Sequence, residues 1–143
     1  MQVVEIMIKA VKTIRVEDSV KDAAELMKKN DIGALIVLDG SGSIVGITTE
    51  RDIIMDVVAE GKDPEKTTME QVMSKKVITI GADNTLEEAA DLMTEHDIRR
   101  LPVIHGGKLV GIVSASDLIL YEKHLIEKLS KLFSLSPQKK IAG

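Results

Sequence analysis

Two short segments of one type could bind a ligand: a hydroxyl residue, two variable residues and an aspartate. Thr49-Glu-Arg-Asp52 and Ser114-Ala-Ser-Asp117 each directly follow a Gly-Ile-X segment. Such a segment predicts a helix start, where hydroxyl and carboxylate cap backbone N–H groups. A helix start also offers N–H donors to an anion, and the carboxylate can accept from a vicinal diol. A plain cap and a ribose phosphate site both fit, and the occurrence of two copies at equivalent places favours the second.

Two adjacent arginines, Arg99 and Arg100, stand at the mouth of the apolar segment 101–104. A guanidinium group can bind phosphate through two parallel hydrogen bonds, so the pair predicts a phosphate contact. The alternative is an ordinary surface ion pair with Glu95 or Asp97.

Enzymatic chemistry finds little support in the sequence. The three histidines, at 96, 105 and 124, lack metal-ligand spacing, and the chain has no cysteine, which excludes disulfides and thiol nucleophiles. The serines have no matching histidine and acid for a triad, and no phosphate loop of the Gly-x-x-x-x-Gly-Lys type is present. Asp52 and Asp117 are better explained as diol acceptors than as an acid/base pair. We expect no catalytic residue, no metal site and no catalytic cofactor.

The composition is aliphatic, with 31 isoleucines and valines but only Tyr121 and Phe133 as aromatic residues. The β-branched excess favours strands, and the scarcity of rings weakens any base-stacking surface for single-stranded nucleic acid. No apolar run approaches the roughly 18 residues of a membrane span, and the N-terminus is unlike a signal peptide. We therefore expect a cytoplasmic protein without a membrane partner.

The chain is an internal duplication, which decides its organisation. A shift of 66, changing to 65 after a turn, gives 19 identities in 49 aligned positions. We expect a first repeat with its linker at 1–66, a second repeat at 67–119, and a helical extension with a frayed tail at 120–143.

Each copy reads as strand, helix, strand, strand, helix. Capping pairs and apolar spacing predict the helices, and short apolar runs between turns predict the strands. A leucine series at 118, 125, 129 and 132 is available for a buried seam on the last helix, which Ser136-Pro137 should end. The expected strands are 11–16, 34–38, 43–48, 101–104 and 108–113, and the expected helices are 20–30, 50–60, 68–72, 86–96 and 115–133.

At residues 5–119 the sequence resembles the cystathionine β-synthase (CBS) domain, here as the tandem pair often called a Bateman module. The resemblance implies an α/β fold in which two β-α-β-β-α repeats pack with pseudo-two-fold symmetry, plus the extended C-terminal helix. It also implies a regulatory module rather than an enzyme. The residues that carry it are Ile6-Met7, Val72-Met73, Ala23-Ala24, Ala89-Ala90, Ile98-Arg-Arg-Leu-Pro-Val103, Gly46-Ile-Thr-Thr-Glu-Arg-Asp52 and Gly111-Ile-Val-Ser-Ala-Ser-Asp117.

The resemblance further implies two crossed clefts that take AMP, ADP, ATP or S-adenosylmethionine as a regulatory ligand. In the first cleft Asp52 would hold the ribose hydroxyls, with Thr49 on the ribose or phosphate. The residues expected there are Thr49, Arg51, Asp52, Val77, Ile78, Ile98, Arg99, Arg100 and Pro102. Those expected in the second cleft are Val11, Lys12, Ile32, Gly33, Ala34, Ile36, Ser114 and Asp117.

The second cleft departs from the family pattern. Gly33-Ala34 stands where the other copy has two arginines, and Ile36 stands in place of Pro102. Lys12 or Arg51 would have to supply the charge that an anion needs there.

Three functional interpretations stay open. The first is a ligand sensor that signals to an unidentified effector protein or through its own homodimer. The second is a nucleic-acid-binding protein that uses residues 120–143, which carry five basic and two acidic side chains; its binding would depend steeply on salt. The third is a structural dimerisation module with vestigial clefts.

Overall fold

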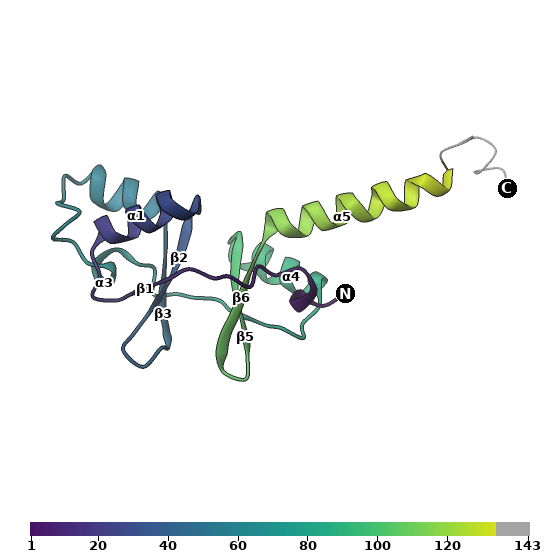
Figure 1. Cartoon of the computed structure of the whole chain (residues 1–143), viewed down its shortest axis with the longest axis horizontal. Helices are drawn as coiled ribbons and strands as arrows, with labels where there is room; N and C mark the ends of the chain where they lie inside the picture. The colour runs from purple at the N-terminus through teal and green to yellow at the C-terminus, as the bar shows by residue number, and fades with distance from the viewer. Residues whose placement is uncertain (134–143) are drawn as a thin grey trace.

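The computed structural model describes residues 1–133, and two similar repeats stand side by side within them (Figure 1). Each repeat has a three-stranded sheet in which the first two strands are parallel and the last two antiparallel. The first repeat consists of β1 (Thr13–Arg15), α1 (Val20–Asn30), β2 (Ala34–Leu38), β3 (Ile44–Thr49) and α2 (Glu50–Ile53), which continues as a π-helical turn over Ile54–Val58. The second consists of β4 (Ile80–Gly81), α4 (Leu86–His96), β5 (Arg100–His105), β6 (Lys108–Ser114) and α5 (Ala115–Ser130).

Capping defines the two central helices. The Ser19 hydroxyl accepts from the Asp22 N–H at 3.1 Å, and the Thr85 hydroxyl accepts from the Glu88 N–H at 3.1 Å. Both helices end at an aspartate in the left-handed region, with φ of 51° at Asp31 and 52° at Asp97, which few residues other than Gly, Asn and Asp adopt readily. The predicted helices over 20–30 and 86–96 are confirmed.

Other boundaries differ from the sequence prediction. The strand expected at 11–16 covers only Thr13–Arg15, because the chain turns just before it, where the Val11 N–H bonds the Lys9 carbonyl at 3.0 Å. The helix expected at 50–60 ends at Val58 and becomes π-helical after Ile53. The helix expected at 68–72 begins at Met69 as α3 (Met69–Val72), with Thr68 as its N-cap.

The segment before each repeat packs on the other repeat. Val3, in a short 3₁₀ helix (Val3–Glu5), is fully buried in the core of the second repeat, and Met69 and Val72 are buried in the core of the first. Backbone bonds tie these segments down: Val3 N–H bonds Asn84 O at 2.8 Å, and Val20 N–H bonds Thr67 O at 2.8 Å. The packing therefore crosses the division that we expected between residues 66 and 67.

The last helix leaves the body of the protein (Figure 1). Leu118 packs partly on the second core, but Leu125, Leu129 and Leu132 are 41%, 49% and 65% exposed. Within residues 1–133 the three outer leucines are not buried, so this part of a single chain does not form the predicted seam. The expected helix end at Ser136-Pro137 and the frayed tail lie outside the described residues. None of the helices within 1–133 has the length and apolar character needed to cross a bilayer.

Candidate functional site

The first cleft lies between the repeats and has a volume of about 770 Å³. All nine residues expected there line it. Thr49 and Asp52 come from the first repeat at the β3–α2 junction, and Arg99 and Arg100 come from the second repeat at the start of β5. The structure thus brings the Thr-x-x-Asp segment of one repeat together with the strand start of the other.

The Thr49–Asp52 segment forms a complete capping box. The Thr49 N–H donates to Asp52 Oδ2 at 2.9 Å, and the Asp52 N–H donates to Thr49 Oγ1 at 3.3 Å. The plain interpretation as a helix cap is therefore confirmed. The cap occupies only the Oδ2 oxygen of the Asp52 carboxylate, because Oδ1 has no protein partner within residues 1–133. Asp52 as a residue is half-buried, and this second oxygen stays free to accept from a ligand.

Four basic side chains line the first cleft: Arg51, Lys76, Arg99 and Arg100. Across residues 1–133 neither arginine of the pair forms an ion pair, so the alternative of a pair with Glu95 or Asp97 is not observed. Unpaired guanidinium groups at the rim of a cavity can bind an anion bidentately.

Aliphatic side chains form the rest of the first cleft. Val77 and Ile78 lie just before β4, Ile98 follows α4, and Pro102 is fully buried in β5. Apolar walls with convergent polar groups are the usual make-up of a small-molecule site. None of the lining residues is aromatic, so a planar base would lie between aliphatic side chains.

The second cleft is smaller, with a volume of about 180 Å³. All eight residues expected there line it. Ser114 and Asp117 repeat the capping box, with the Ser114 N–H donating to Asp117 Oδ2 at 3.0 Å. The volume lies below the roughly 300–1,000 Å³ typical of ligand pockets. Among the described residues, the basic side chains that line it are those of Lys12 and Arg100.

Several lining residues were missed from the sequence. Ile8 lines the second cleft through its bridge to Ile112, and Ser74 lines the first through its bridge to Ile47. Residues 8 and 74 are equivalent in the duplication, but their pairing is non-local and nothing in the local pattern indicates it. Lys76 could have been found, since it directly precedes Val77. The other missed residues are Gly33, Ile47, Glu50 and Asp97 in the first cleft, and Ala10, Arg100 and Ile112 in the second.

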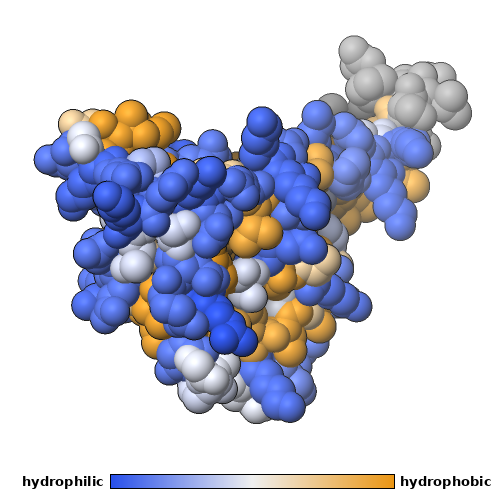
Figure 2. All heavy atoms as spheres, turned by 60° about the vertical axis from the view of Figure 1, so that its left-hand side comes forward, coloured by the Kyte–Doolittle hydropathy of each residue, from blue (hydrophilic) through white to orange (hydrophobic). Residues whose placement is uncertain are grey.

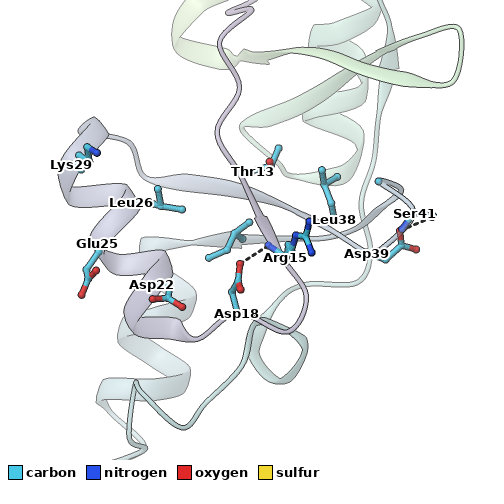
Figure 3. A pocket seen from close by; sticks show the side chains of 13 residues that line it. Thr13, Arg15, Asp18, Asp22, Glu25, Leu26, Lys29, Leu38, Asp39 and Ser41 are labelled. Carbon is cyan, nitrogen blue, oxygen red and sulfur yellow. Dashed lines mark hydrogen bonds between the residues drawn. The ribbon is translucent and has the colours of Figure 1, made fainter.

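A larger groove of about 870 Å³ lies on the first repeat alone, between β1, α1 and the β2–β3 turn (Figure 3). Its acids have structural partners: Asp18 accepts from the Arg15 N–H at 3.0 Å, and Asp39 accepts from the Ser41 hydroxyl at 2.7 Å. The Ser41 hydroxyl, followed by the Ser43 and Ser41 N–H groups, lowers the pKa of Asp39. These carboxylates hold the turns of the first repeat, and the groove brings in no residue of the second.

Comparisons with known proteins agree with this geometry. The model of the CBS domain matches residues 3–59 and 69–124. The chain is 35% identical over 128 residues to the CBS domain-containing protein YhcV of Bacillus subtilis, covering 90% of each. It is 37% identical over 106 residues to the uncharacterized protein MK0525 of Methanopyrus kandleri, covering 73% of this chain but only 54% of that protein.

A solved structure is similar throughout the repeats. The CBS domain pair of protein MJ0100, in complex with 5′-methylthioadenosine and S-adenosyl-L-methionine, superposes with a TM-score of 0.78 at 30% identity. The match covers 87% of this chain and 97% of that one. Fold, duplication and matched residues agree, and the chain belongs to the CBS domain family.

Proposed function

We propose that this protein is a regulatory module that binds an adenosine-containing ligand in the first cleft. The observation that carries the proposal is the meeting of Asp52 from one repeat with Arg99 and Arg100 from the other around one cavity. A free carboxylate oxygen suits the two hydroxyls of a ribose, and unpaired guanidinium groups suit a phosphate. A ribose phosphate presents both groups together.

The arrangement suggests how the ligand would lie. The ribose would contact Asp52 and Thr49, the phosphate would extend toward the arginines, and the base would enter between Val77, Ile78 and Ile98. The similar CBS pair of MJ0100 holds two adenosine-containing molecules, which supports this class of ligand.

Binding would transmit a signal by linkage. A ligand that touches both repeats stabilises the relative arrangement of the repeats that it contacts best. The size of the signal equals the difference between its affinities for the two arrangements. An effector protein, or a second copy of this chain, would sense that arrangement.

A melting experiment tests the proposal. AMP, ADP, ATP and S-adenosylmethionine are each added to the wild type, Asp52→Ala and Asp117→Ala. A ligand at 100 times its Kd stabilises the fold by about 2.7 kcal/mol, which raises the Tm by several degrees. We expect at least one ligand to raise the wild-type Tm and Asp52→Ala to reduce that shift. If none of the four moves the wild-type Tm, the proposal is wrong and the vestigial interpretation stands.

A homodimer is part of the proposed function. Among residues 1–133, most exposed large apolar side chains lie on the second helices of the two repeats, some at equivalent positions: Ile54 with Ile119, and Met55 with Leu120. Figure 2 shows a hydrophilic surface on which apolar side chains gather in groups, one of them at its upper left edge. Symmetric exposure of this kind suits an isologous interface with a second copy.

Charge also favours a second copy. Residues 50–60 carry four acidic side chains and one basic, whereas Lys128 lies one helical turn from Leu125, on the leucine side of α5. The helix of one copy therefore complements the acidic second helix of the other, with apolar side chains on both.

A further inference from the structure

The two clefts meet at a single point. Only Gly33 and Arg100 line both cavities among the described residues. A Cβ on Gly33 would lie 3.4 Å from Arg100 Nη2 and would strike the Glu50 carboxylate. A side chain at position 33 would therefore displace the Glu50 carboxylate, while the Arg100 guanidinium would stay at an ordinary contact distance.

The duplication does not reproduce this arginine. Gly33 is the equivalent of Arg99, and Ala34 is the equivalent of Arg100. The start of β2 therefore supplies no guanidinium group to the second cleft. Among residues 1–133, the guanidinium group that lines the second cleft is that of Arg100, which also lines the first cleft. Besides Arg100, the first cleft keeps three basic side chains, whereas the second keeps only Lys12.

Arg100 is uncommitted in the protein alone. It is half-buried, and its side chain has no hydrogen bond or ion pair to any of residues 1–133. The planar fork of one guanidinium can bind one phosphate bidentately, not two phosphates on opposite sides. Two phosphates brought close together also repel each other.

We propose that Arg100 couples the two clefts. A phosphate-bearing ligand in the first cleft binds the Arg100 guanidinium. It thereby weakens the binding of a second phosphate-bearing ligand in the second cleft. A nucleoside without a phosphate makes no demand on Arg100, so its binding in the second cleft is independent of the first. The inference rests on the proposed function. It adds that occupation of the first cleft affects only those ligands of the second cleft that carry a phosphate.

Calorimetric titration with AMP and with adenosine tests the coupling. The Kd of the second cleft is measured with the first cleft filled, and again in Asp52→Ala, where the first cleft is disabled. Filling the first cleft should raise the second Kd for AMP about tenfold, within the usual range of coupling between sites. Adenosine should show no such change.

Two variants test whether Arg100 is the residue that couples the clefts. Arg100→Ala should bring the coupling for AMP to about onefold. Arg99→Ala, the adjacent arginine that lines only the first cleft, should weaken binding in that cleft but keep the coupling.

The outcomes separate the two proposals. If neither AMP nor adenosine binds any form, the proposed function itself fails. If AMP binds but the coupling survives in Arg100→Ala, or adenosine shows the same coupling as AMP, only the role of Arg100 is overturned. If Asp52→Ala binds no AMP, the second cleft is not a phosphate-ligand site and the coupling is likewise overturned.

Discussion

The thioether of Met73 lies directly against the Cα of Gly46, and Met7 lies in the same way against Gly111. Each methionine belongs to the segment that precedes one repeat, and each glycine belongs to the third strand of the other. Backbone bonds hold the first contact in place, since Ile47 and Ser74 exchange N–H···O bonds of 3.0 and 2.9 Å. The exchanged segments therefore leave no room for a side chain at position 46.

Gly46→Ala should destabilise the fold. A new Cβ would strike the Met73 thioether and would lie 3.0 Å from the Ser74 carbonyl oxygen, so backbone as well as side chain must move. Such overpacking costs about 1–3 kcal/mol of unfolding free energy. Urea denaturation measures the loss, and Gly40→Ala is the matched control, because nothing lies within 4 Å of its Cβ position. Equal stability of the two variants would contradict this prediction, since it would mean that Met73 and Ser74 move aside without loss of unfolding free energy.

The sequence predicts the local structure well. It does not predict that the segment before each repeat packs on the other repeat. The helices over 20–30 and 86–96 agree with the structure because capping residues and apolar spacing, all within one segment, determine them. The burial of Val3 in the second repeat depends on contacts with residues about 80 positions away, which no local pattern carries. The Thr49–Asp52 and Ser114–Asp117 segments stand out because the duplication repeats them at equivalent places, whereas most other cleft residues were predicted from the resemblance to the CBS domain.

Thr48→Val should stabilise the protein. Thr48 is fully buried, and its hydroxyl has no hydrogen-bond partner among residues 1–133. Its equivalent in the second repeat is Val113, also fully buried. Removing an unsatisfied buried hydroxyl should raise the unfolding free energy by about 1 kcal/mol, seen as a higher urea midpoint at constant slope. The reverse change, Val113→Thr, should lower it, and a loss of stability in Thr48→Val would contradict this account.

Asp52→Asn should separate capping from ligand binding. An asparagine oxygen can still cap α2, so the stability should fall by no more than about 1 kcal/mol. A charge-assisted bond to the ligand would be lost, which should weaken binding about tenfold or more. Asp22→Asn is the control, because Asp22 makes the same capping box in α1 outside both clefts. Equal ligand affinity in the two variants would argue against Asp52 as the ribose acceptor.

Acid should remove the contribution that Asp39, in the β2–β3 turn, makes to the unfolding free energy. The pKa of Asp39 lies below its ordinary 3.8, foremost because the Ser41 hydroxyl donates to the carboxylate. A group whose pKa falls on folding stabilises the fold above its unfolded pKa and loses that effect as the pH drops through the folded pKa. The difference in unfolding free energy between wild type and Asp39→Ala should therefore shrink from about pH 5 to pH 2. Urea denaturation across that range measures it, and a difference that grows toward acid would contradict the prediction.

Leu125→Glu combined with Leu129→Glu should dissociate the proposed homodimer. Helical spacing puts Leu125 and Leu129 on one side of α5 and Lys123 on the opposite side. Both leucines are 41–49% exposed within one chain, so the change costs little intrachain packing and the Tm of the monomer should stay close to that of the wild type. Burying two glutamates in an apolar interface is strongly unfavourable, because a charge loses its water there without gaining a partner.

Sedimentation velocity over a range of concentrations reads out this change. The wild type should sediment as a dimer and the double variant as a monomer, while Lys123→Glu should remain dimeric. A wild type that is monomeric at high concentration would remove the homodimer from the proposed function. Dissociation by Lys123→Glu as well would place the contact on the charged side of α5, against the apolar interface inferred from Leu125 and Leu129.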